Sequence, residues 1–140
     1  MLEQTKETLK SQIKRFEGVR KFPYTCTQGK ITIGVGHNLT DNGLPEHLIE
    51  TIFILDLIDA LKDLESIFGE LEGGHLIALT DLRFNLGATR FRTFKKLINF
   101  VKEKDWINAA VELEDSKWWN QVQPDRGNLI RKQLLTGELS

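Results

Sequence analysis

A nearly continuous apolar stripe in the middle of the chain limits most strongly what this sequence can fold into. It follows Pro45, which suits the first turn of a helix, and it stops before Gly73-Gly74. Its members recur at helical spacing, and they are Ile49, Ile52, Phe53, Leu57, Leu61 and Leu64. The stripe predicts a helix from about 45 to 68 that separates a shorter first part of the chain from a longer second part.

The two flanking parts differ in their secondary-structure patterns. Phe22 to Thr27 and Lys30 to Val35 carry β-branched residues on either side of Gln28-Gly29, which predicts a short β-hairpin. After Gly74, apolar residues at helical spacing predict several helices, the last from about 128 to 135. The 140 residues, 40% of them hydrophobic, suit one compact unit.

We therefore predict a single α+β domain over residues 1–140, mostly helical with a small β-hairpin or sheet. Its expected parts are an N-lobe at about 1–44, a connecting helix at about 45–68 and a C-lobe at about 74–140. Two lobes joined by one helix predict a cleft whose width depends on hinge bending.

Glu17 is placed by its neighbours at the C-terminal end of a first helix. Leu9, Ile13 and Phe16 recur at helical spacing before it, and Gly18 follows as a stop signal. The negative end of the helix dipole and apolar packing both disfavour the carboxylate form. A carboxyl group that holds its proton suits the role of a general acid.

Thr32 and Cys26 lie on the two facing arms of the predicted hairpin. Ile31, Ile33 and Val35 share one face of the second arm, so the period of two turns Thr32 to the opposite face. We expect the Thr32 hydroxyl to project into a cleft while the isoleucines anchor the strand. Cys26 is the single cysteine, which excludes an intramolecular disulfide, and its plainer interpretation is a small half-buried core residue.

The order and spacing of Glu17, Cys26 and Thr32 resemble the active-site segment of glycoside hydrolase family 24, the lysozymes of tailed phages. Four later motifs are similar to C-lobe motifs of that family, namely Phe84-Asn85-Leu86-Gly87, Ser116-Lys117-Trp118-Trp119-Asn120-Gln121, Pro124-Asp125-Arg126 and Thr136-Gly137. The resemblance implies a lysozyme-like fold and an endolysin. Such an enzyme hydrolyses the β-1,4 bond between N-acetylmuramic acid and N-acetylglucosamine in peptidoglycan.

The resemblance also implies catalytic roles. Glu17 would protonate the leaving glycosidic oxygen, while Cys26 and Thr32 would hold and activate water on the opposite face of the sugar. The family usually has aspartate where this chain has Cys26, although cysteine is known there. A thiolate suits a base or a nucleophile, whereas a neutral thiol leaves Thr32 and solvent to position the water.

Further residues match the family's cleft. Asn85, Trp118 and Arg126 correspond to substrate-binding positions on the C-lobe side, and their plainer interpretations are a helix cap, core packing and an exposed cation. In the family the matching arginine faces the catalytic glutamate and favours its ionised form. His37 corresponds to a histidine that forms a structural pair with an acidic residue of the connecting helix, for which Asp56 is the candidate.

Peptidoglycan is the expected partner. We expect no stable membrane insertion, because no run has the length of a membrane span, and the charged start at 1–14 lacks the apolar core of a signal peptide. No nucleic-acid partner is expected without a dense basic patch or motif, and Gly34-x-Gly36 lacks the remainder of a phosphate-binding loop. The three histidines lack metal-ligand spacing, so we expect no cofactor and no metal.

The resemblance further implies where the protein works. A phage lysozyme accumulates in the cytoplasm of the bacterial host and reaches the cell wall after release through a separate holin. We expect a monomer. Two other functions stay open: a catalytically silent peptidoglycan-binding module, and a lytic transglycosylase, in which the glutamate alone suffices and the product is an anhydro-sugar.

Overall fold

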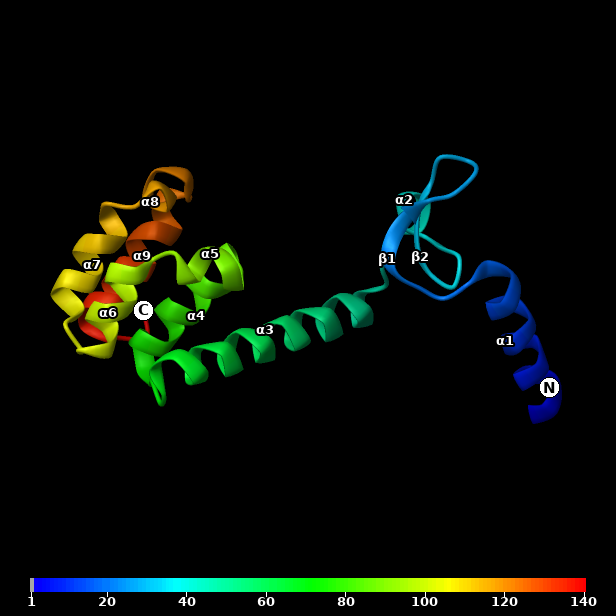
Figure 1. Ribbon diagram of the computed structural model, residues 1–140, viewed down its shortest axis with the longest axis horizontal. Helices are drawn as coiled ribbons and strands as arrows, with labels where there is room; N and C mark the ends of the chain where they lie inside the picture. The colour runs from blue at the N-terminus through cyan, green and yellow to red at the C-terminus, as the bar shows by residue number, and fades with distance from the viewer. Residues whose placement is uncertain (1) are drawn as a thin grey trace. The chain divides into compact units, whose positions relative to one another are not determined.

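A computed structural model describes residues 2–140 and has the predicted α+β class, with nine helices and a small three-stranded sheet in that range (Figure 1). The elements are α1 Glu3–Glu17, β1 Arg20–Thr25, β2 Ile31–Gly34, β3 His37–Asn38, α2 Leu39–Asn42, α3 Glu46–Phe68, α4 Gly73–Leu86, α5 Ala88–Arg92, α6 Lys95–Lys102, α7 Trp106–Glu114, α8 Lys117–Gln121 and α9 Pro124–Thr136. The prediction of a mostly helical α+β fold is therefore confirmed.

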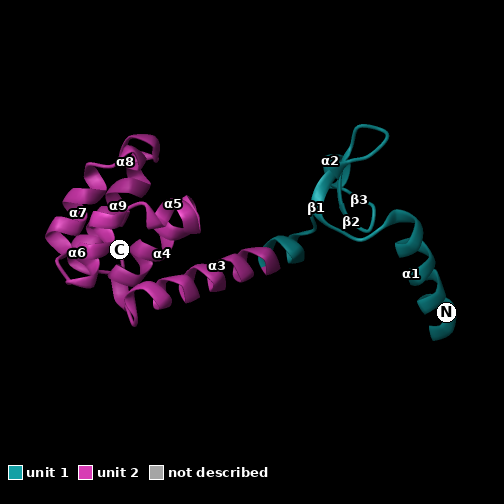
Figure 2. Cartoon of the chain, in the orientation of Figure 1, with its two compact units in different colours: residues 1–50 teal, residues 51–140 magenta. Residues whose placement is uncertain are grey.

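The chain divides into two compact units, residues 1–50 and residues 51–140 (Figure 2). The division falls inside α3, whose observed start at Glu46 lies one residue from the predicted start. Among residues 2–140, no helix has both the length and the apolar character needed to cross a membrane. The assignment of both units to one two-lobed domain stays a prediction.

The first unit contains α1, the short helix α2 and the antiparallel sheet β1-β2-β3. The predicted hairpin is present, since Tyr24 of β1 pairs with Thr32 of β2. Gly29 in the connecting turn has φ +78°, a conformation that glycine adopts without strain. The third strand, only two residues long, was not predicted, and it pairs Asn38 with Thr32.

The burial pattern of β2 differs from the prediction that its isoleucines anchor the strand. Thr32 is 4% exposed, whereas Ile31 is 51% exposed and Val35 36% exposed. Thr32 is covered because it occupies the middle strand and its hydroxyl turns back to donate to the carbonyl of Lys30, at 3.1 Å. The alternation was predicted correctly, but the covered face of the strand is the one that carries the hydroxyl.

The second unit is a helical bundle around one apolar core. Helix α4 packs against α9, and α7 packs against both α6 and α9. The buried core comprises Leu64, Ala78, Leu79, Leu82, Phe91, Leu97, Ile98, Val101, Ala109, Leu113, Trp118, Ile130 and Leu134. The last helix begins at Pro124, earlier than the predicted 128, because proline fits the first turn, where its missing N–H has no helical partner.

The C-terminal tail packs closely over the start of α4. The Gly74 amide donates to the carbonyl of Gly137 at 2.9 Å, and a Cβ at Gly74 would lie only 2.0 Å from the carbonyl oxygen of Glu138. His75 stacks on Trp106 with ring centroids 3.7 Å apart, and it lies directly beneath Gly137. Burial lowers the pKa of His75, because the charged imidazolium loses hydration there.

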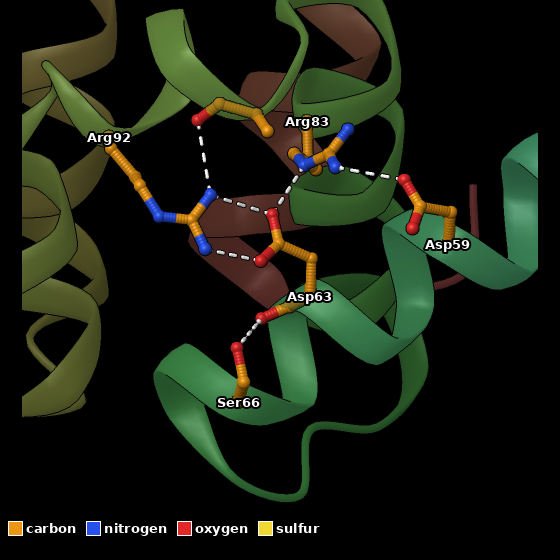
Figure 3. Close-up of polar contacts among 6 residues, drawn as sticks. Asp59, Asp63, Ser66, Arg83 and Arg92 are labelled. Atoms are coloured by element: carbon orange, nitrogen blue, oxygen red, sulfur yellow. Dashed lines mark hydrogen bonds and ion pairs between the residues drawn. The ribbon is translucent and has the colours of Figure 1, made fainter.

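Three helices of the second unit meet at a cluster of ion pairs around Asp63 of α3 (Figure 3). Arg83 of α4, which is 7% exposed, donates from Nε to Asp63 at 2.6 Å, and its Nη2 lies 3.4 Å from Asp59. Arg92 of α5 donates from both Nη atoms to the two oxygens of Asp63. Asp63 thereby holds α4 and α5 against α3.

We expect Gly74→Ala to lower the free energy of unfolding by about 2 kcal/mol, the usual cost of forcing extra atoms into a packed site. The clash is with the backbone of the tail, which must move as a whole. Gly127→Ala is the matched control, because its Cβ would meet the side chains of Val122 and Trp119 at 3.0 Å and 3.3 Å, and side chains can shift. Urea denaturation measures both variants, and equal losses would contradict the prediction.

The pH dependence of stability follows from Asp63. The hydrogen bonds from Arg92 and then Arg83 lower its pKa to about 2. Since the folded-state pKa lies below the unfolded one, Asp63 stabilises the fold above about pH 4, and about 2 kcal/mol is lost as the pH falls toward 2.

Urea denaturation of wild type and Asp63→Asn between pH 5 and pH 2 measures this contribution. The free energy of unfolding of the variant should fall less steeply with decreasing pH than that of the wild type. Asp59→Asn is the control, because the side chain of Asp59 is 80% exposed and an exposed ion pair contributes little. Identical pH profiles for wild type and Asp63→Asn would contradict the prediction.

Candidate active site

Glu17 is the last residue of α1, as predicted, and Gly18 ends the helix with φ +80°. Its carboxyl group lies against the turn between β2 and β3, since a Cβ at Gly36 would be 2.8 Å from Oε2 of Glu17. The absence of a side chain at Gly36 therefore leaves the space that the carboxyl group occupies.

The predicted apolar packing behind Glu17 differs from what the structure shows. None of the described residues of α1 is buried, and Leu9, Ile13 and Phe16 are 46%, 44% and 75% exposed. Their helical spacing is present, but spacing fixes only which residues share a face of the helix. The position of the Glu17 carboxyl group is thus set by the end of α1 and by the space beside Gly36, and not by buried apolar neighbours on α1.

Cys26 follows β1 in the tight turn of the hairpin, where its amide donates to the carbonyl of Lys30 at 2.9 Å. The thiol is free and half-buried. Hydrogen bonds from the backbone amides of Gln28 and Lys30, with a smaller one from the Thr32 side chain, lower the pKa of Cys26, although burial partly opposes them. A thiol held in this way forms a thiolate more readily, which is the reactive form of cysteine.

Thr32 and Cys26 are brought together, as their positions on facing arms predict. The Thr32 hydroxyl lies between two acceptors, the carbonyl of Lys30 at 3.1 Å and the sulfur of Cys26. Its single proton serves one acceptor at a time. The pair can therefore hold a small polar molecule by exchanging one of these bonds for a bond to it.

His37 bonds to the carbonyl oxygen of Gly43 within the first unit, where its Nε2 lies 2.6 Å from that oxygen. A carbonyl only accepts, so Nε2 carries the proton. Asp56 lies on α3 in the second unit. The structural pair of His37 with Asp56 stays a prediction.

The three predicted substrate-binding residues share one pocket in the second unit. Trp118 is 2% exposed, and its indole Nε1 donates to Oδ1 of Asn85 at 2.7 Å. Arg126 forms an ion pair with Asp81, and its Nε donates to that carboxylate at 3.0 Å. The pocket has a volume of about 300 Å³ and is lined by Asn85, Arg90, Trp118, Gln121, Val122, Gln123 and Arg126.

Three polar residues of this pocket, Arg90, Gln121 and Gln123, were not predicted. Arg90 of α5 donates from Nη2 to Oε1 of Gln121 at the end of α8, at 2.8 Å. Gln121 belongs to the Ser116–Gln121 motif, so the sequence carried a signal for it. Arg90 lies outside the quoted motifs, and only the position of α5 brings it to the pocket.

Comparison with known proteins places this geometry in context. The family model described as phage lysozyme matches residues 14–134. A relative named "Probable T4-type lysozyme 2" from Dictyostelium discoideum is 29% identical over 164 aligned positions, which cover 94% of this chain and 96% of the relative. "Probable T4-type lysozyme 1" from the same organism is 28% identical over 165 positions, with 95% and 96% covered.

The pKa of the single thiol is open to direct measurement. We expect absorbance at 240 nm to show thiolate formation at lower pH in the folded protein than in the urea-unfolded chain, because the Gln28 and Lys30 amides stabilise the anion only in the folded turn. Thr32→Val should raise the pKa of Cys26 in the folded protein partway toward its value in the unfolded chain, because it removes one of the hydrogen bonds to the sulfur. Thr40→Val is the control, because the hydroxyl of Thr40 accepts from the Ile31 amide instead. If the thiol titrates at the same pH in the folded and the unfolded chain, the expectation is contradicted.

Proposed function

The chain belongs to the phage lysozyme family, and on that premise we propose that it is an endolysin that cleaves the glycan strands of peptidoglycan. It is a lysozyme-type enzyme whose substrate is peptidoglycan. The proposed reaction is hydrolysis of the β-1,4 bond between N-acetylmuramic acid and N-acetylglucosamine. The observation that carries the proposal is that one unit holds the Glu17 carboxyl group and the paired Cys26 and Thr32 side chains.

Glu17 acts as the general acid. Its proton passes to the glycosidic oxygen as the bond between that oxygen and the anomeric carbon breaks. The position of the carboxyl group supports this role, because Gly36 keeps the turn beside Oε2 clear of a side chain. The glutamate leaves the step as a carboxylate and regains a proton from solvent.

Cys26 and Thr32 serve the attacking water. The thiolate accepts a proton from the water as its oxygen bonds to the anomeric carbon, and the Thr32 hydroxyl orients that water. The hydrogen bonds that lower the pKa of Cys26 favour the thiolate form, which is the form that can accept this proton. Direct attack by sulfur is the competing route, and it would produce a covalent intermediate and retention of configuration.

Asn85, Trp118 and Arg126 bind the glycan. The bond from Trp118 to Asn85 fixes the Asn85 amide at the pocket, and the pairing with Asp81 fixes the Arg126 guanidinium. A rigid set of donors and acceptors beside an aromatic ring is typical of a small-molecule or sugar site. These residues contribute affinity and orientation, while the bond-breaking groups belong to the first unit.

The proposed biological role is lysis of the bacterial host for release of phage. In this proposal the enzyme accumulates in the host cytoplasm, and a holin gives it access to the wall. Expression in bacteria tests the role. We expect cell density to fall only when a holin is co-expressed or the membrane is permeabilised, and lysis by the enzyme alone would contradict holin dependence.

Digestion of purified peptidoglycan tests the chemistry, with released fragments identified by mass spectrometry. We expect wild type to release fragments with reducing ends and Glu17→Gln to lose at least about a hundredfold in rate, the usual minimum contribution of general acid catalysis. Glu114→Gln, a surface carboxylate paired with Arg131, is the matched control. Near-normal cleavage by Glu17→Gln would overturn the proposal.

The same digestion separates the alternatives. Anhydro-sugar products, lighter by one water, would indicate a lytic transglycosylase, and sedimentation with the wall without cleavage would indicate a silent binding module. Cys26→Ser and Cys26→Asp report on the thiol. We expect Cys26→Asp to remain active, because a carboxylate can accept the same proton from water, and Cys26→Ser to be slowed.

A further inference from the structure

Arg90 is an arginine of the second unit whose charge is not matched by a carboxylate. Arg83, Arg92, Arg126 and Arg131 each form an ion pair with an aspartate or glutamate. Among residues 2–140, Arg90 has no such ion pair, and its guanidinium donates to the neutral amide of Gln121 at 2.8 Å. A guanidinium has five N–H donors, so this bond leaves donors for a ligand in the pocket.

The bond to Gln121 orients both side chains at the pocket. Oε1 of Gln121 accepts from Arg90, so the amide nitrogen of Gln121 points away from the arginine. Both residues line the pocket of Asn85, Trp118 and Arg126. Arg90 also lines the neighbouring pocket of about 500 Å³, so this residue lies where the two pockets adjoin.

Helix α5 has only five residues, too few for a helix to be stable by itself. Its position is set by contacts of its side chains on two sides. Phe91 is buried in the core and packs edge-on against Phe68, with centroids 6.3 Å apart. Arg92, the residue after it, binds both oxygens of Asp63 (Figure 3).

We propose that Arg90 is a further substrate-binding residue, which donates hydrogen bonds to oxygen acceptors of the peptidoglycan, and that the Arg92–Asp63 ion pair positions it. The inference rests on the proposed function. Arg92 and Asp63 are positioning residues that do not touch the substrate. The ion pair holds the α5 backbone, and the backbone directs Arg90 toward Gln121 and the pocket.

The first test is kinetic, with purified peptidoglycan as the probe. We expect Arg90→Ala to raise the apparent KM about tenfold and to leave kcat within about twofold, because binding energy common to ground and transition states changes KM alone. Arg90→Lys should recover part of the loss, since an ammonium group donates but lacks the planar fork. The control is Arg131→Ala, which removes the same charge from a surface pair with Glu114.

A double-mutant cycle tests the positioning role. We expect Arg92→Ala to raise the apparent KM about threefold in the wild type, and to have no further effect when Arg90 is already alanine. A purely structural role of Arg92 would raise the apparent KM equally in both backgrounds, which would overturn the positioning. Arg92→Lys keeps a cation beside Asp63 and provides a second variant if the alanine variant folds poorly.

Sedimentation with peptidoglycan separates failure of this inference from failure of the proposed function. If wild type cleaves in a Glu17-dependent manner and Arg90→Ala has an unchanged apparent KM, the inference is wrong and the function stands. If wild type sediments with peptidoglycan without cleaving it, and Arg90→Ala weakens that binding about tenfold, the function is wrong and the inference stands. If wild type neither cleaves nor sediments, both are wrong.

Discussion

Asp63 is the carboxylate on which the geometry of the second unit depends most. It lies on α3 and accepts hydrogen bonds from Arg83 on α4 and from Arg92 on α5, so one charge connects three helices. Arg83 is nearly buried, and a buried cation without its partner is costly. The pairing therefore helps to hold α5 in place, and α5 in turn carries Arg90 to the wall of the pocket that Asn85 and Trp118 also line.

In the first unit, the surroundings of Cys26 lower the pKa of its thiol. In the proposed reaction this thiol takes the place of the aspartate that the family usually has. Backbone amides of the hairpin turn supply most of the stabilisation of the Cys26 thiolate. Gly29, with φ +78°, completes the tight turn that carries these amides. The backbone amides of the turn thus lower the pKa of the residue that follows β1.

Much of the fold and of the candidate site could be predicted from local patterns. The end of α1 at Glu17, the hairpin around Gln28-Gly29 and the helix after Pro45 each depend on residues within a few positions of one another. The pairing of Cys26 with Thr32 follows from the register of one hairpin. The predictions that Ile31 anchors its strand and that apolar residues of α1 pack behind Glu17 were wrong, since these side chains are exposed. Periodicity shows which residues share a face of an element, but it does not show whether other segments cover that face.

The sequence by itself determined most of the helices and the β-hairpin, the order of the motifs and the residue types that carry the proposed chemistry, because propensity, turn geometry and spacing act over short distances along the chain. The tertiary structure alone decided that Asn85, Trp118 and Arg126 line one pocket, that Arg90 and Gln121 join them, and that Asp63 holds α5 in place. Those contacts join residues about 30 positions apart, such as Arg90 and Gln121 or Asp63 and Arg92. Only packing around the common core brings such distant segments together.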